Sequence, residues 1–276
     1  MSSFDDVVRY QRDGGVATIT LNRPESLNSM NDDLMLALDQ ALKRVEADQD
    51  VRVLVLTGTG RGFCSGADLS GVGTGSDADG DLAADGDAAA AGMDEVFHPP
   101  IRRLAALAVP SIARINGVAA GGGLGLALAC DIAVAARSAR FVCTFGPRLG
   151  IVPDLGTTFH LPHRVGAARA RAMAMLGDPI SADQAAEWGL IWRAVDDADL
   201  DRDVADLAAR LARSSPDAMA RIRQSLAHAE TNSLPEQLDL ERDHQRHLIP
   251  RNMGEGAAAF REKREPTFEP TRWDQP

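Results

Sequence analysis

The sequence has little cysteine, no excess of positive charge and no long apolar run. Its three cysteines are an odd number, without a C-x-x-C pair or a histidine at zinc spacing, so we expect reduced thiols and no metal site. The 29 Lys and Arg residues are outnumbered by 40 Asp and Glu residues, which leaves a net charge of -11. This balance argues against a broad nucleic-acid or anionic-membrane surface, although a local basic patch could still bind an anionic ligand.

The sequence also lacks the signals of membrane insertion and secretion. Its longest uncharged segment, residues 115–130, has 16 residues and is rich in glycine, whereas a spanning helix needs about 20 apolar residues. The N-terminal residues MSSFDDVVRY are acidic where a signal peptide needs a basic start and an apolar run. We therefore expect a cytoplasmic protein with no membrane partner.

What is present is a chain of 276 residues, 45% of them hydrophobic, which is enough to bury a large core. Residues 7–11 and 16–22 predict a hairpin around the turn DGG, because the second run is rich in β-branched residues. Residues 30–48 carry an apolar stripe at helical spacing, with Asn31 and Asp32 near its start, and residues 51–58 predict a buried strand. The order of strand, helix and strand indicates an α/β fold with a mainly parallel sheet.

The second half of the chain is dominated by helical patterns. From about residue 154 these patterns include a possible capping box at Ser181 and Gln184, and LIWRAV is the one late strand expected among them. We predict an α/β core over residues 1–200 and a helical C-terminal part over residues 201–276. Residues 71–92 are mostly Gly, Asp and Ala, a composition that predicts a mobile loop, with a lid over a pocket as the alternative.

A glycine cluster, AAGGGLGLALACD at residues 119–131, raises the question of phosphate binding. It fits neither the G-x-G-x-x-G dinucleotide pattern nor a P-loop, and GFCSG at residues 62–66 is not a serine-hydrolase elbow. Glycine still allows close approach of a ligand, and the first N–H groups of a helix have no internal partners. Two such groups from different loops would make an oxyanion hole; the alternative is that the glycines only allow tight packing of helix on sheet.

Five blocks in this order carry a resemblance to a known family: LNRPESLNSMN, VLVLTGTGRGFCSGADLS, VPSIARINGVAAGGGLGLALACDIAVAARSARF, LGIVPDLGTTFHLPHRVG and GDPISADQAAEWGLIWRAV. They resemble the crotonase superfamily, which contains enoyl-CoA hydratases and isomerases. The resemblance implies a spiral ββα core, a C-terminal helical trimerisation part, and homotrimers that often pair into hexamers. It also implies an acyl-CoA substrate and no cofactor other than the CoA of that substrate.

The resemblance also implies a set of site residues. The thioester oxygen would be held by the backbone N–H groups of Ala67 and Gly122. Contacts to the substrate and its CoA group are implied for Arg23, Gly66, Asp68, Leu69 and Gly121. They are also implied for Phe260 and Lys263, which lie in the C-terminal segment that a neighbouring subunit lends to the site. For Lys263 the alternative is a solvated helix face, since Arg261 and Arg264 alternate with Glu262 and Glu265.

The acid-base residues point to the reaction. Hydratases of this family use two glutamates, but the first position is Gly125 here, and residues 141–153 contain no Asp or Glu at the second. Asp154 remains, where some isomerases and a dehalogenase of the family carry an aspartate, and it could move one proton; the alternative is that it caps a helix beginning near Leu155. His98 could face the same pocket or the solvent. We therefore expect an enoyl-CoA isomerase acting on a 3-enoyl or ring-derived acyl-CoA, with a hydratase and a non-catalytic acyl-CoA binder as alternatives.

Overall fold

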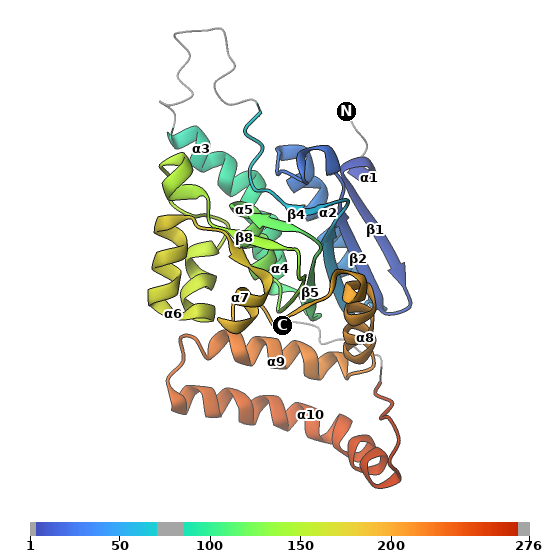
Figure 1. The fold of residues 1–276 in the computed structure, drawn as a ribbon. Helices are drawn as coiled ribbons and strands as arrows, with labels where there is room; N and C mark the ends of the chain where they lie inside the picture. Colours follow the sequence, from blue (N-terminus) through green and yellow to red (C-terminus); the bar gives the residue numbers. More distant parts are fainter. Residues whose placement is uncertain (1–3, 71–85, 270–276) are drawn as a thin grey trace, which may run out of the picture.

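Figure 1 shows the computed structural model, which describes residues 4–70 and 86–269. The larger of its two sheets has six strands in the order β1-β2-β3-β5-β7-β10. β1 and β2 form the predicted hairpin, with Val8 opposite Leu21, and all other neighbours in this sheet are parallel. The strands are β1 (Val8–Asp13), β2 (Val16–Leu21), β3 (Val53–Gly58), β5 (Ser111–Ile115), β7 (Ile132–Ala136) and β10 (Arg193–Val195).

A second sheet has the order β4-β6-β8-β9, in which β9 is antiparallel to β8. Its strands are β4 (Gly62–Cys64), β6 (Val118–Ala120), β8 (Arg140–Val142) and β9 (Ile180–Ser181). β4, β6 and β8 each follow a strand of the larger sheet after a few residues and each precede a helix. The chain therefore repeats a ββα unit, which confirms the predicted crotonase-like fold.

Helices pack on this framework through apolar faces. The predicted helix is α2 (Asp32–Ala47); the side chain of Asn31 accepts a hydrogen bond from the Leu34 N–H at 3.0 Å, and Leu38 and Leu42 are fully buried. On the other face of the larger sheet, Val204 of α8 packs near Val55. The remaining helices of the core are α1 (Phe4–Val7), α4 (His98–Ala106), α5 (Gly122–Leu128), α6 (Thr157–Leu176), α7 (Ala182–Glu187) and α8 (Leu200–Ala212).

The structure describes the last seven residues of the low-complexity run. Residues 86–92 form a short exposed helix, α3 (Gly86–Gly92), which continues into a π-helical turn at Met93–Phe97. The prediction of an irregular loop missed this helix, because four consecutive alanines have a high helix propensity that outweighs the Gly and Asp of the composition. The prediction for residues 71–85 lies outside the described residues.

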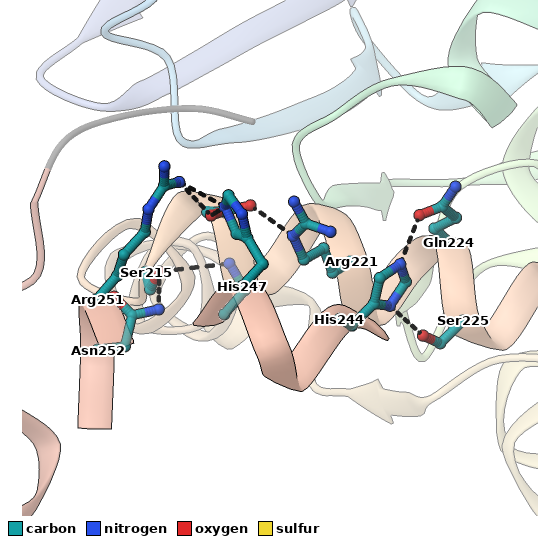
Figure 2. Close-up of polar contacts among 10 residues, drawn as sticks. Ser215, Arg221, Gln224, Ser225, His244, His247, Arg251 and Asn252 are labelled. Atoms are coloured by element: carbon teal, nitrogen blue, oxygen red, sulfur yellow. Dashed lines mark hydrogen bonds and ion pairs between the residues drawn. The ribbon is translucent and has the colours of Figure 1, made fainter. Parts of the chain in front are cut away.

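Two C-terminal helices, α9 (Pro216–His228) and α10 (Leu234–Glu262), form an antiparallel hairpin, in which α9 lies between α10 and the core (Figure 1). The contact between them is unusually polar. His244 is buried and lies 2.9 Å from both Gln224 Oε1 and Ser225 Oγ (Figure 2), and Asp217 Oδ2 accepts a hydrogen bond from His247 at 2.7 Å. The division into parts at residue 200 and the trimerisation role stay predictions.

None of the helices in the described ranges 4–70 and 86–269 has the length and hydropathy needed to cross a bilayer. Cys64, Cys130 and Cys143 are all buried and free. Burial raises the pKa of the Cys64 and Cys130 thiols to about 12, so these thiols stay protonated. The cytoplasmic location stays a prediction.

Candidate functional site

The first of the two expected N–H donors, Ala67, lies in the loop after β4. Gly66 O accepts a hydrogen bond from Met30 N at 2.7 Å, and Asp68 N donates to Met30 O at 2.8 Å. The residues on both sides of Ala67 therefore bind Met30, and the Ala67 N–H points to the opposite side because successive groups of an extended chain alternate. It has no acceptor among the described residues.

The second donor, Gly122, is the first residue of α5, so its N–H has no acceptor within the helix. The residue before it, Gly121, has φ +51° and ψ -127°, a conformation that favours glycine, and its own N–H donates to Val142 O at 2.9 Å. A Cβ placed on Gly66, whose φ is +98°, would lie 3.4 Å from Gly122 N and 3.0 Å from Ala120 O. The two loops thus touch through their glycines, which brings both N–H groups to one place.

Asp154 lies in the turn that leads into α6. Its backbone oxygen accepts a hydrogen bond from Thr157 N at 2.9 Å, but the N-cap of α6 is Gly156, so the Asp154 side chain does not cap this helix. Its Oδ1 atom is buried and has no hydrogen-bond partner in the part of the chain that the structure describes. Burial raises the pKa of Asp154, while a backbone hydrogen bond and the charge of His98 act in the lowering direction.

The turn that carries Asp154 packs directly on α5. A Cβ on Gly125 would lie 2.7 Å from both Leu155 O and Thr157 Oγ1, and one on Gly122 would lie 2.8 Å from Leu155 Cδ1. Leu155 has φ +48°, a strained conformation for a residue with a branched side chain. The space beside Gly125, where the family's hydratases carry a glutamate, is therefore filled by the Leu155 carbonyl and the Thr157 hydroxyl.

Arg23 and Asp68 form an ion pair beside the Ala67 loop, with Arg23 Nη2 2.7 Å from Asp68 Oδ2. Arg23 also donates to Ser29 O at 2.7 Å. Hydrogen bonds from Ser70 and from the Arg23 guanidinium hold the pKa of Asp68 well below its usual range, so this carboxylate stays ionised and is a poor proton carrier. The neighbouring Leu69 is half exposed.

Phe260 and Lys263 lie at the C-terminal end of α10, on the far side of α9 from the core (Figure 1). Phe260 is 86% exposed, and Lys263 has φ +54° as the C-cap of the helix. The structure thus brings Ala67, Gly122 and Asp154 to one region of the core, with Arg23, Gly66, Asp68 and Gly121 in or against the two donor loops, but it does not bring Phe260 and Lys263 there.

Two residues near this region were not assigned from the sequence. The sequence left open whether His98 faces the pocket or the solvent. Its charge lowers the pKa of the Asp154 carboxyl, so the two residues lie close together. Its Nδ1 atom lies 3.0 Å from Asp94 Oδ1. Arg164 on α6 donates to Leu128 O at 2.7 Å and to Cys130 O at 2.8 Å, at the C-terminal end of α5. No motif in the sequence signals that contact.

A cavity of about 960 Å³ lies elsewhere, on the face of the larger sheet that α8 covers. Thr57, Arg114 and Asp201 line it, together with valines and alanines of the sheet and of α8. Arg114 Nη2 is already paired with Asp201 Oδ1 at 2.6 Å. This cavity shares no residue with the candidate site.

Comparisons with known proteins identify the family and agree with the fold. The family profile described as "Enoyl-CoA hydratase/isomerase" matches residues 11–271. The chain is 48% identical to the 1,2-epoxyphenylacetyl-CoA isomerase of Escherichia coli K12, over 92% of this chain and 95% of that protein, and 33% identical to 4-chlorobenzoyl coenzyme A dehalogenase-1 of an Arthrobacter species, over 84% and 82%. The crystal structure of an enoyl-CoA hydratase from Bacillus anthracis superposes with a TM-score of 0.86 at 30% identity, covering 96% of this chain and 99% of that one. The chain belongs to the enoyl-CoA hydratase/isomerase family of the crotonase superfamily, and it is an acyl-CoA enzyme.

Proposed function

We propose that this enzyme is an acyl-CoA isomerase in which Asp154 moves one proton while the N–H groups of Ala67 and Gly122 hold the thioester oxygen. The observation that carries the proposal is the buried Oδ1 atom of Asp154, which lies in a turn packed on α5 and has no hydrogen-bond partner within residues 4–70 and 86–269. An unpartnered buried carboxylate oxygen is costly unless a ligand uses it. The raised pKa of Asp154 moves the carboxyl toward the range in which it can both accept and return a proton.

The reaction needs only one carboxylate. Asp154 removes a proton from carbon 2 of a 3-enoyl thioester, and the electron pair of that C–H bond delocalises into a dienolate with its negative charge on the thioester oxygen. Hydrogen bonds from Ala67 and Gly122 stabilise this charge, and each such donor contributes about 3 to 4 kcal/mol. Asp154 then returns the proton to carbon 4, so the double bond moves to the 2-position and no atom is gained or lost.

The activity of the Escherichia coli relative supports a ring-derived acyl-CoA as the substrate class. That protein is named as an isomerase of 1,2-epoxyphenylacetyl-CoA, a thioester that carries a modified ring. The proposed substrate of the present chain is therefore also a ring-derived acyl-CoA. Arg23, Gly66, Asp68, Leu69 and Gly121 are proposed to contact the substrate and its CoA group, since they lie in or beside the loops that carry the donors.

The C-terminal helices support the proposal of a homotrimer or a dimer of trimers. α9 and α10 expose a series of large apolar side chains that a neighbouring subunit would cover: Ile222, Leu226, Leu234, Leu238, Ile249, Met253 and Phe260. Since Phe260 and Lys263 lie away from Asp154 in their own chain, we propose that they reach the site of a neighbouring subunit.

The test is to offer matched 3-enoyl-CoA and 2-enoyl-CoA thioesters to the wild type, to Asp154→Asn and to Asp178→Asn. Asp178 is exposed, so the last variant controls for the loss of one carboxylate. We expect isomerisation by the wild type and by Asp178→Asn, and a loss of at least about 100-fold in Asp154→Asn, the low end of the range for a group that transfers protons. Unchanged isomerisation in Asp154→Asn would refute the mechanism. Net hydration of the 2-enoyl thioester would favour a hydratase, and binding without turnover would favour a non-catalytic binder.

A further inference from the structure

Arg164 is a half-buried charged residue of α6 whose guanidinium, among the described residues, binds only backbone carbonyls, and these come from three distant positions of the chain. Nη2 donates to Leu128 O at 2.7 Å and to Cys130 O at 2.8 Å, and Nη1 donates to Leu190 O at 3.3 Å. Among residues 4–70 and 86–269 no carboxylate lies within ion-pair distance of it, whereas Arg103 of α4 and Arg223 of α9 each have such a partner. Partial burial of a charge without an ion pair costs free energy, so we expect the contacts of this arginine to serve a purpose.

The three carbonyls show what Arg164 connects. Leu128 is the last residue of α5, so its carbonyl is one of those that a helix leaves without an internal partner. Arg164 itself lies on α6, just before Gly166, whose φ of 76° and ψ of 163° interrupt the helix. The piece of α6 that carries Arg164 therefore begins at Thr157, directly after the turn of Asp154. One side chain ties the C-terminal end of α5 to the helical piece that follows Asp154.

The opposite end of α5 touches the same segment. Leu155 and Thr157 pack so closely on Gly122 and Gly125 that no Cβ fits there. A single contact would leave α5 free to pivot against that segment, whereas contacts at both ends fix its direction. Since α5 has seven residues and is about 10 Å long, a rotation of about 6° around its Leu128 end would displace the Gly122 N–H by about 1 Å.

The positive charge of Arg164 also favours an N–H donor at the opposite end of α5. The carbonyl end of a helix carries partial negative charge, and in a helix of two turns this charge opposes the positive potential at the N-terminal N–H groups. A guanidinium on the carbonyl end compensates the negative charge there. Although burial lowers the pKa of Arg164, an arginine side chain remains protonated in proteins.

We infer that Arg164 is a positioning residue, which holds the Gly122 N–H and the Asp154 carboxylate in the relative position needed to stabilise a thioester enolate. This inference rests on the proposed function. It does not make Arg164 a catalytic residue, because its guanidinium is bound to carbonyls at the end of α5 opposite Gly122.

The experiment compares Arg164→Gln and Arg164→Lys with the wild type, and uses Arg171→Gln as the matched control, since Arg171 is an exposed arginine of the same helix. Two quantities are measured: kcat and KM for isomerisation of a 3-enoyl-CoA, and the absorption band of bound 4-aminobenzoyl-CoA. This thioester has no double bond to move, and its band shifts to longer wavelength when hydrogen bonds polarise its carbonyl. A thermal melt of each variant checks that it is folded.

We expect Arg164→Gln to lower kcat about tenfold with KM within about twofold, well short of the roughly 100-fold or more that the loss of a whole donor costs. The red shift of the bound thioester decreases in parallel, Arg164→Lys lies between Arg164→Gln and the wild type, and Arg171→Gln matches the wild type. A wild-type kcat and red shift in a folded Arg164→Gln would overturn the inference. If that variant does not fold, Arg164→Lys decides: a smaller red shift at unchanged KM supports the inference, and an unchanged red shift refutes it.

The failure of the proposed function would look different. If the wild type binds 4-aminobenzoyl-CoA with no red shift, or if Asp154→Asn isomerises at the wild-type rate, the oxyanion hole or the proton carrier is wrong whatever the Arg164 variants do. If the wild type shows the red shift and Asp154→Asn loses isomerisation, the proposed function stands. If the Arg164 variants then show no effect, only the role of Arg164 is refuted.

Discussion

Adding a single methyl group at Gly125 is the sharpest test of how the site is built. A Cβ there would lie 2.7 Å from Leu155 O and from Thr157 Oγ1, and 3.2 Å from Leu155 Cβ, where ordinary contact begins at 3.4 Å. The two oxygens therefore have to move by roughly 0.7 Å, one of them is backbone, and Thr157 is fully buried. Gly125→Ala must displace the turn that carries Asp154.

The stability change follows from two opposing effects. Overpacking of this kind costs about 1 to 3 kcal/mol, and the rigid backbone contact places it near 3, whereas replacing glycine by alanine within a helix gains about 1 kcal/mol. The net loss is about 2 kcal/mol, or a decrease in Tm of about 4 to 8 °C for a domain of this size. We also expect a lower kcat, because Asp154 moves away from the Gly122 N–H.

The matched control is Gly254→Ala, because Gly254 is exposed in the interior of α10 and a Cβ there meets no atom within 4 Å. Without a clash, only the gain in helix propensity remains, so Tm rises by about 2 to 4 °C. Thermal unfolding and isomerase kinetics of both variants are the assay. If Gly125→Ala were as stable and as active as Gly254→Ala, the close packing of the Asp154 turn on α5 would be wrong.

Three further variants test other parts of the structure. Folding raises the pKa of Asp154 above its ordinary 3.8, so the wild type loses stability as the pH rises from 3.8 through the folded-state pKa. Asp154→Asn should therefore resist urea better than the wild type at pH 7 but not below pH 3.8. An equal gain in stability at both pH values would contradict this prediction. The charge of His98 lowers the pKa of Asp154, so His98→Gln should move the acidic limb of the kcat/KM profile to higher pH. An acidic limb at the same pH in this variant would show that His98 does not influence the ionisation that limits the rate. Asp217→Asn removes the buried carboxylate of α9 that binds His247 of α10 at 2.7 Å and Arg251 of α10 at 3.3 Å, and should cost about 3 to 5 kcal/mol in urea unfolding, whereas the exposed Asp239→Asn should cost less than about 1 kcal/mol. Similar values for both variants would show that the α9–α10 contact does not depend on the Asp217 carboxylate.

Local periodicity was enough to predict most of the framework. The hairpin of β1 and β2, the helix capped by Asn31 and the strand before Gly58 all follow from patterns within about 20 residues. The late strand in LIWRAV is present as β10, which joins the larger sheet beside β7. These elements are predictable because each buries one face, and the spacing of apolar residues records which face that is.

Features that depend on distant contacts could not be predicted in this way. The Leu155 turn has a positive φ that no residue type signals, and it is held there by packing on α5. The contacts of Arg164 join residues 26 to 36 positions apart, and the ion pair of Arg23 with Asp68 joins residues 45 apart. Asp154 itself was found through the resemblance, while its unpartnered oxygen is visible only when the fold is known.

Because of the contacts of Gly125, a single substitution cannot replace the carboxylate at position 154 by one at position 125. A glutamate at position 125 needs the space that Leu155 O and Thr157 Oγ1 occupy, and vacating that space moves the turn in which Asp154 lies. An acid on α5 and the present position of Asp154 are therefore mutually exclusive. Gly125→Glu would displace the proposed proton carrier at position 154 before it supplied one at position 125. The path of the backbone over residues 153–157, which packs on α5 and leads into the helical piece that carries Arg164, therefore decides whether this chain can place a carboxylate at position 154 or at position 125.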